Sequence, residues 1–148
     1  MTNTDTSNRF TVYTEGDTLY DDMLRGIAAA KSSIAMESYI FNPDPVGIRF
    51  IDALIERVRA GVQVRLHLDA FGSLSLALST EDSRMRDAGI ELKWFNTLRW
   101  YKPLRFNRRN HRKLLIIDQK SVWLGGFNIH KENSRRESGT GPCQSRSK

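Results

Sequence analysis

The chain has 148 residues, a formal net charge of +6 and 39% hydrophobic residues, which suits one domain with a modest core. No run of about 18 apolar residues occurs, so no transmembrane helix is expected, and the polar tail at residues 1–9 shows no signal-peptide pattern. The only cysteine, Cys143, excludes an internal disulfide. The three histidines are scattered along the chain, so neither a zinc site nor any other metal or cofactor is expected.

The first part of the chain alternates between strand and helix patterns. Residues 10–13 form a short strand candidate, and residues 18–31 carry apolar side chains at helical spacing, with Asp17 as a possible N-cap. The next strand, residues 33–41, places Ile34, Met36, Ser38 and Ile40 on one face.

The alternation continues to residue 95. In order, the pattern predicts a loop at residues 42–45, a helix at 46–60 ended by Gly61, a strand at 62–69, a helix at 80–88 ended by Gly89, and a strand at 90–95. Such an order predicts the α/β class, a mixed sheet flanked by helices.

A strand, a turn and a second strand follow a basic connecting segment. The apolar run at residues 114–117 is a buried strand candidate, residues 119–121 form the turn, and residues 122–124 form the second strand. This pair of strands carries the most informative pattern in the chain.

Residues 111–128 fit the pattern H-x-K-x4-D-x6-G-G-x-N. The pattern fixes the positions of His111, Lys113, Asp118, Gly125, Gly126 and Asn128. His111 and Lys113 are two residues apart, so on a strand they project from one face. An imidazole can attack phosphorus or protonate a leaving alkoxide, and a lysine beside it can pair with phosphate oxygens.

The other motif positions suit the binding of a phosphate. Gly125 and Gly126 let the backbone turn and approach a ligand closely, and Asn128 can donate its amide to a phosphate oxygen. The candidate site therefore comprises His111, Lys113 and Asp118 as catalytic residues, and Gly126 and Asn128 as substrate-binding residues. For Asp118, which ends the apolar run, a role in capping the strand and bonding the turn fits better than proton transfer.

A basic region surrounds the motif. Its members are Arg99, Lys102, Arg105, Arg108, Arg109, Arg112, Lys113, Lys120, Lys131, Arg135 and Arg136, opposed in the sequence by Asp118 and Glu132. Aromatic residues are interleaved with it or lie just before it: Trp94, Phe95, Trp100, Tyr101 and Phe106. Cationic and aromatic residues together suit an anionic membrane interface or stacking on single-stranded nucleic acid, and composition does not choose between them.

Two acidic residues on earlier strands are further candidates. Glu37 and Asp69 could border the same crevice as His111, because ligand sites gather at the carboxyl ends of strands in α/β sheets. Structural roles fit them better: Asp69 would cap a loop and Glu37 would satisfy a basic partner. We treat both as supporting groups.

The motif resembles the signature of the phospholipase D superfamily, whose active sites use two such motifs, and other segments narrow the resemblance to bacterial cardiolipin synthases. These segments are Arg-Asn-His-Arg-Lys-Leu-Leu-Ile-Ile-Asp at 109–118, Glu-Ser-Tyr-Ile-Phe at 37–41, Val-Gly-Ile-Arg-Phe-Ile-Asp-Ala-Leu at 46–54 and Gly-Val-Gln-Val-Arg-Leu-His-Leu-Asp-Ala-Phe-Gly-Ser at 61–73. The likeness covers about residues 10–136 and corresponds to the N-terminal half of the family's catalytic region. It implies one phospholipase D-like half-domain.

The resemblance also implies an activity. A phosphatidyl group would pass between two phosphatidylglycerol molecules through a phosphohistidine, with His111 as the nucleophile or its acid–base counterpart. The partners implied are anionic phospholipid, a peripheral membrane surface at the inner face of a bacterial cell membrane, and a second copy or a complementary second half; nucleic acid fits less well. No metal is implied.

The chain departs from the family after the motif. The family continues with a strand whose carboxylate orients the histidine, whereas residues 137–148 are polar and read as a disordered tail. A frameshift or premature stop after about Arg136 would produce such a tail and leave a half with little activity alone. Two alternatives stay open: a homodimeric single-motif phosphodiesterase or endonuclease, and an inactive fragment that binds anionic membranes.

Overall fold

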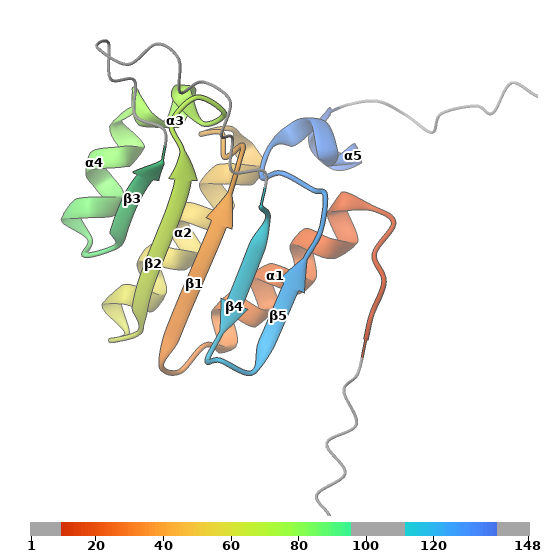
Figure 1. The fold of residues 1–148 in the computed structure, drawn as a ribbon, viewed down its shortest axis with the longest axis horizontal. Helices are drawn as coiled ribbons and strands as arrows, with labels where there is room; N and C mark the ends of the chain where they lie inside the picture. Colours follow the sequence, from red (N-terminus) through yellow and green to blue (C-terminus); the bar gives the residue numbers. More distant parts are fainter. Residues whose placement is uncertain (1–9, 96–111, 139–148) are drawn as a thin grey trace, which may run out of the picture.

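A five-stranded mixed sheet forms the centre of the computed structural model, which describes residues 10–95 and 112–138 (Figure 1). The strands are β1 (Ser33–Ser38), β2 (Gln63–Asp69), β3 (Glu91–Phe95), β4 (Leu114–Ile117) and β5 (Ser121–Leu124), in the spatial order β3-β2-β1-β4-β5. β1, β2 and β3 run parallel, whereas β4 is antiparallel to both β1 and β5. The predicted α/β class with a mixed sheet is confirmed.

Helices cover one face of this sheet (Figure 1). The helical elements are α1 (Gly16–Ala29), α2 (Pro45–Arg59), α3 (Leu74–Ala77), α4 (Thr80–Asp87), the short 3-10 helix η2 (Lys131–Asn133) and α5 (Arg135–Ser138). Alternate strand residues face α1, α2 and α4, and Ile34, Leu66 and Leu115 are almost wholly buried between the two layers. One continuous core therefore holds the sheet and its helices together.

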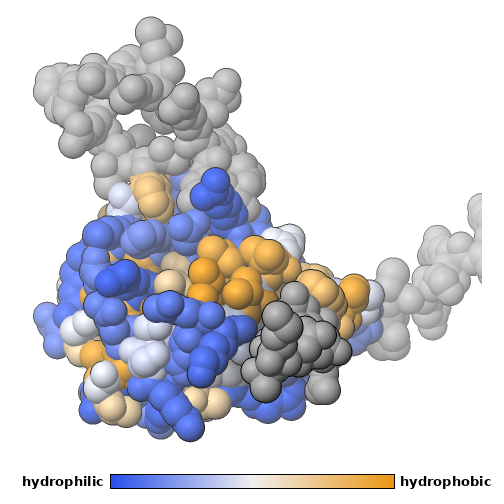
Figure 2. All heavy atoms as spheres, turned by 60° about the horizontal axis from the view of Figure 1, so that its bottom comes forward, coloured by the Kyte–Doolittle hydropathy of each residue, from blue (hydrophilic) through white to orange (hydrophobic). Residues whose placement is uncertain are grey.

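The face of the sheet opposite the helices carries different kinds of side chain on its two halves. On β2 and β3 it carries charged residues such as Arg65 and Lys93, whereas on β4 and β5 it carries apolar ones. Val122 and Leu124 of β5 are 53% and 77% exposed. Figure 2 shows apolar residues gathered beside a hydrophilic area on the molecule's surface.

Most helix ends follow the sequence signals. Asp44 accepts hydrogen bonds from the backbone N–H groups of Val46 and Gly47 at the start of α2, as an N-cap should. Gly61 and Gly89 follow α2 and α4 with positive φ angles of 87° and 100°, which glycine adopts without steric cost.

The start of α1 differs from the prediction. The helix begins at Gly16, and Asp17 lies in its first turn instead of capping it. The carboxylate of Asp17 accepts hydrogen bonds from the hydroxyl of Ser134 and from the backbone N–H groups of Arg135 and Arg136. Asp17 therefore fixes the start of α5, a long-range role that local sequence does not signal.

Two other predicted boundaries were wrong. Residues 10–13 form no strand, and Phe10 and Val12 are each 88% exposed, because no neighbouring strand pairs with this segment. The predicted start of the C-terminal tail, residue 137, is too early in the chain, because Glu137 and Ser138 belong to α5. Residues 1–9 and 139–148, the rest of the two predicted tails, lie outside the described residues.

Candidate functional site

The motif spans the β4–β5 hairpin and the segments at its two ends. His111, the predicted nucleophile, lies outside the described residues, which resume at Arg112. Lys113 directly precedes β4, and Gly125, Gly126 and Asn128 follow β5. Because the two strands are antiparallel, with Leu114 paired to Leu124, Lys113 and Gly125 lie at the same end of the hairpin.

Lys113 lies against an aromatic ring. Its ammonium is 5.8 Å from the centroid of the Tyr39 ring, within the range of a cation–π interaction. Burial lowers the pKa of Lys113 from its ordinary value, because partial desolvation disfavours the charged form. A half-buried cation with restricted hydration is suited to binding a phosphate oxygen directly.

Asn128 is held by both its side chain and its backbone. Its Oδ1 accepts a hydrogen bond of 3.2 Å from the backbone N–H of Ile40, and its backbone carbonyl accepts from the Tyr20 hydroxyl and from Asn133 Nδ2. Because the amide oxygen of Asn128 accepts the hydrogen bond from Ile40, the NH2 group of the same amide points away from Ile40. This orientation makes Asn128 a hydrogen-bond donor toward a ligand.

The structure brings Lys113 and Asn128 to the same end of β1. Lys113 contacts Tyr39, and Asn128 contacts the next residue, Ile40. Beyond Asn128 the chain runs parallel to the extension of β1, where Ile129 N–H donates to the carbonyl of Ile40 over 3.0 Å. The segment after the glycines thus takes the place beside β1 that β4 leaves.

Gly125 and Gly126 lie in open space. A Cβ atom added at either glycine would meet no atom of the described chain within 4 Å, and neither has a positive φ angle. By contrast, a Cβ at Gly47 or Gly72 would collide with a backbone carbonyl. Within the described residues, neither packing nor backbone conformation requires glycine at these two positions.

Asp118 lies at the other end of β4, separated from Lys113 by five residues, or roughly 16 Å of extended chain. Its carboxylate accepts hydrogen bonds from the backbone N–H groups of Lys31, Ser32 and Ser33 and from the Ser32 hydroxyl. These backbone donors, led by Ser33, hold the pKa of Asp118 well below its usual range. This position favours the capping and turn role considered for Asp118 over proton transfer.

The two supporting acids have different surroundings. The Asp69 carboxylate is buried and accepts hydrogen bonds of 3.0 and 3.1 Å from the backbone N–H groups of Phe71 and Gly72, so it caps the loop after β2. The Glu37 carboxylate lies 3.8 Å from Nδ1 of His67 on the sheet face opposite the core. Both arrangements match the structural roles considered for these residues.

Tyr39 is a site residue that the sequence reading missed. Its ring lies under Lys113, and its backbone carbonyl accepts a hydrogen bond of 3.1 Å from the Ser73 hydroxyl. Ser73, which is fully buried, also accepts from the backbone N–H of Phe41. The strand pattern marked residue 39 only as alternating away from the core, and the pairing of β1 with β4 that brings it near Lys113 is a tertiary feature.

The described members of the predicted basic region lie at different places on the molecule. Arg135 pairs with Glu15 at 2.9 Å, and Arg136 pairs with Asp21 at 2.8 Å, so α1 and the residue before it supply acids that the local sequence count omitted. Lys120 lies in the turn at the opposite end of β4 from Lys113. Of the described members, Arg112 and Lys113 remain at the motif, and residues 99–109 lie outside the described residues.

The aromatic residues of this region also separate. Trp94 donates its indole N–H to Asp82 over 2.9 Å and packs against the core, whereas Phe95 is 40% exposed and contacts the ring of His67 edge-on. Trp94 therefore has a structural role. Trp100, Tyr101 and Phe106 fall among the residues that the structure does not describe.

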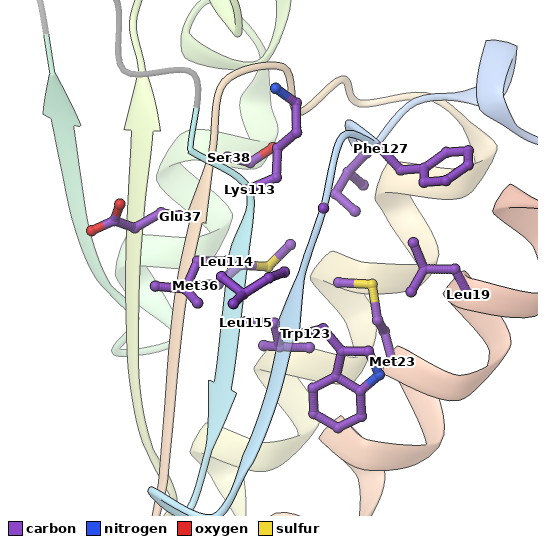
Figure 3. A pocket seen from close by; sticks show the side chains of 13 residues that line it. Leu19, Met23, Met36, Glu37, Ser38, Lys113, Leu114, Leu115, Trp123 and Phe127 are labelled. Atoms are coloured by element: carbon purple, nitrogen blue, oxygen red, sulfur yellow. The ribbon is translucent and has the colours of Figure 1, made fainter. Parts of the chain in front are cut away.

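An apolar pocket opens beside Lys113 (Figure 3). Its walls come from α1, β1, β4, β5 and the segment after the glycines, and its cavity volume is about 30 Å³, roughly the room that one water molecule occupies. The apolar walls include Met23, Met36, Leu115, Trp123, Phe127 and Ile129. The candidate phosphate-binding end thus adjoins a small pocket with mainly apolar walls.

Neither a metal centre nor a membrane span was found in the described part of the chain. Nowhere in residues 10–95 and 112–138 do three or more His, Cys, Asp or Glu side chains cluster so that they could hold a metal ion. Over the same ranges, none of the helices has the length and hydropathy needed to span a bilayer.

Curated sequences similar to the chain are cardiolipin synthases. The chain is 35% identical over 136 residues to the probable cardiolipin synthase YwiE of Bacillus subtilis, covering 91% of this chain and 27% of the relative. It is 39% identical over 126 residues to the cardiolipin synthase of Oceanobacillus iheyensis, covering 85% and 26%. The chain therefore spans about a quarter of the length of these relatives.

Solved structures and a family model agree with this similarity. The phospholipase D family member Nuc from Salmonella typhimurium aligns with a TM-score of 0.56 and 25% identity, covering 79% of this chain and 66% of Nuc. NucT from Helicobacter pylori shares the fold, with a TM-score of 0.56, 21% identity, and coverage of 79% and 70%. The family model described as "Cardiolipin synthase, PLD-like domain" matches residues 23–139. The chain belongs to this family, the phospholipase D-like domain of cardiolipin synthases.

Proposed function

We propose that the chain supplies one of the two motifs of a phosphatidyltransferase of the cardiolipin synthase type. The observation that carries the proposal is the placement of Lys113 beside Tyr39 and of Asn128 beside Ile40, at the same end of β1, with the glycine pair between β5 and Asn128. One cation and one oriented amide donor can hold the non-bridging oxygens of a phosphodiester. The family membership names phosphatidylglycerol as the first substrate to test.

In the proposed reaction His111 attacks the phosphorus of one phosphatidylglycerol. The bond from phosphorus to the glycerol oxygen breaks, and the glycerol leaves with a proton taken from a general acid. The glycerol hydroxyl of a second phosphatidylglycerol then attacks phosphorus, loses its proton to the same group and forms cardiolipin, which regenerates His111. Lys113 and Asn128 stabilise the charge on the phosphate oxygens in both steps.

In this proposal the second motif comes from a second copy of the chain or from a complementary half. The general acid would be the histidine of that motif, so turnover requires both motifs. We further propose that the protein works at the inner face of a bacterial cell membrane as a peripheral protein, because its substrate is an anionic membrane lipid.

The covalent step can be tested on the chain itself. After incubation with dihexanoylphosphatidylglycerol and quenching in base, which preserves a phosphohistidine, mass spectrometry should find a dihexanoylphosphatidyl adduct on the peptide that contains His111. The peptides that contain His67 and His130 serve as internal controls and should stay unmodified. His111→Ala should reduce the adduct to background. An adduct that persists in this variant would exclude the proposed nucleophile.

Turnover and particle size separate the alternative functions. A dimer that releases glycerol from phosphatidylglycerol supports the phosphatidyltransferase. A dimer that instead nicks DNA without added metal would indicate the single-motif endonuclease. A monomer that forms no adduct and turns over neither substrate would indicate an inactive, membrane-binding fragment. Sedimentation velocity gives the size, and the two assays use the same preparation.

A further inference from the structure

Tyr39 is held between Lys113 and the loop that follows β2. The ammonium of Lys113 lies over its ring, 5.8 Å from the centroid, and its backbone carbonyl accepts a hydrogen bond of 3.1 Å from the buried Ser73 hydroxyl. Gly72 lies so close that an added Cβ atom would overlap the Tyr39 carbonyl and come within 3.1 Å of ring atom Cε2. The loop therefore fixes both the backbone and the ring of Tyr39 on this side.

The loop that supports Tyr39 is itself anchored to the sheet. The buried carboxylate of Asp69, the last residue of β2, accepts hydrogen bonds of 3.0 and 3.1 Å from the backbone N–H groups of Phe71 and Gly72. The Ser73 hydroxyl also accepts a backbone N–H from the segment after β1 over 2.9 Å. These bonds tie the loop to two neighbouring strands, so it is a rigid support for the ring.

The ring in turn restricts Lys113. A lysine side chain is long and has many rotamers, so its ammonium samples a wide volume unless a neighbour holds it. In Figure 3 the Lys113 side chain points away from the apolar walls of the pocket, and its ammonium meets the face of the Tyr39 ring. An aromatic face attracts a cation without a formal negative charge. Such a contact holds the ammonium without competing for it as strongly as a carboxylate would.

We infer that Tyr39 is a positioning residue of the phosphate site: its ring fixes the Lys113 ammonium where a non-bridging phosphate oxygen binds, and the loop at residues 69–73 fixes the ring. The inference rests on the proposed function and extends the site to a loop that the motif does not include. Tyr39 acts through Lys113 in this role and contacts no reacting atom. Preorganisation raises affinity, because the lysine is already ordered before phosphate arrives.

Affinity for inorganic phosphate tests this role in the full chain. In NMR titrations of backbone amides, Tyr39→Leu should weaken binding by about tenfold, as expected when a partly desolvated cation–π contact is lost. Tyr39→Phe keeps the ring and should keep the affinity of the parent protein. The control is Phe95→Leu, which removes a 40% exposed ring from the end of β3, two strands away from β4. It should have no effect.

The pKa of Lys113 distinguishes positioning from a loss of packing. Burial lowers this pKa, and an aromatic ring opposes that effect because it attracts the charged form. Tyr39→Leu should therefore lower the pKa of Lys113 further, whereas Tyr39→Phe should leave it in place. A local loss of packing would instead admit water and raise the pKa toward its ordinary value. A 13C NMR titration of lysine Cε carbons, assigned with Lys113→Arg, gives the measurement.

Gly72→Ala tests the contribution of the loop. The added Cβ would collide with Tyr39, so phosphate affinity should fall although residue 72 lies outside the motif. In combination with Tyr39→Leu it should cause little further loss, because both substitutions act through residue 39. Losses that add in full would show two independent effects and would contradict the role of the loop.

Three further results would overturn the inference. Unchanged phosphate affinity in Tyr39→Leu would show that the ring does not position Lys113. An equal loss in Tyr39→Phe would assign the effect to the hydroxyl, and a raised pKa of Lys113 in Tyr39→Leu would assign it to packing. Any of these results together with a His111 adduct in the parent protein would reject the positioning role and keep the proposed function. The expected losses without an adduct would keep the positioning role and reject the covalent chemistry.

Discussion

At the scale of single residues, Asn128 shows how the fold prepares a side chain for binding. Its amide oxygen meets the N–H of Ile40, and its backbone carbonyl meets two side-chain donors from α1 and η2. A side chain held in this way loses little conformational freedom when a ligand arrives. The NH2 group is therefore the part of Asn128 available for specificity.

Asn128→Asp should uncouple folding from anion binding. The carboxylate still accepts from Ile40 N–H, so the thermal midpoint should stay near that of the parent protein, but the donor is replaced by a negative oxygen. Affinity for inorganic phosphate, followed by NMR titration of backbone amides, should fall by on the order of tenfold or more, the usual effect of losing a hydrogen bond to a charged group. Gln63→Glu, which adds the same charge on exposed β2, is the control; equal losses in both would indicate a general charge effect.

Asp118→Asn should lower the urea midpoint of unfolding at neutral pH. The substitution removes the charge that accepts from the backbone N–H groups of Ser33, Lys31 and Ser32. The pKa of Asp118 is lower in the folded state than in the unfolded chain, so its contribution is present above the unfolded carboxyl pKa of about 3.9 and is lost as pH falls toward the folded value.

The difference between the parent protein and Asp118→Asn should therefore be full at pH 7 and shrink below about pH 4. Urea titrations at several pH values provide the measurement. Asp87→Asn removes an equal charge from an exposed position at the end of α4 and should leave the midpoint unchanged. A difference for Asp118→Asn that is independent of pH would show that the charge has no stabilising role.

At the scale of elements, the β4–β5 hairpin determines the geometry of the motif. Its turn has φ angles of 51° at Asp118 and 57° at Gln119, and Lys120 N–H donates to the carbonyl of Ile117 over 3.0 Å. Two successive positive φ angles with this bond define a type I′ turn, whose twist matches that of paired strands. The Asp118 carboxylate then binds the turn to the start of β1. This contact fixes the register of the hairpin relative to β1 and therefore the position of Lys113 relative to Tyr39.

Gln119→Gly should stabilise the protein. The positive φ angle costs glutamine energy that glycine avoids, partly offset by glycine's greater freedom in the unfolded chain, so we expect a gain of roughly 0.5–1 kcal/mol in the free energy of unfolding. Urea denaturation measures it. Gln63→Gly provides the opposite case, because Gln63 lies within β2 and should lose stability. A loss at both positions would contradict the turn assignment.

At the scale of the whole molecule, the two faces of the sheet differ in how far their side chains are buried. α1, α2 and α4 bury one face, whereas in the described residues the apolar half of the other face, on β4 and β5, carries exposed Val122 and Leu124. β5 is also an edge of the sheet. Exposed apolar edge strands promote association between chains.

Val122→Lys should reduce self-association. A charge on the exposed face of β5 opposes both face-to-face and edge-to-edge contact, so the weight-average mass at high protein concentration should fall toward that of the monomer. Sedimentation equilibrium over a range of concentrations measures this mass. Val12→Lys, at an 88% exposed valine outside the sheet, should have no effect. An unchanged mass for Val122→Lys would place the contact elsewhere.

The class of the fold and most element positions could be predicted from the amino-acid sequence, and the motif indicated the phosphate-binding chemistry that we propose. These depend on local signals: the alternation along Ser33–Ser38, the helix stops at Gly61 and Gly89, and the spacing from Lys113 to Asn128. Only the tertiary structure decided which motif residues meet. Antiparallel pairing of β4 with β1 brings Lys113 to Tyr39 and carries Asp118 to the far end, and packing against α1 makes Asp17 the anchor of α5. Such partners lie tens of residues apart, so no local pattern could specify them.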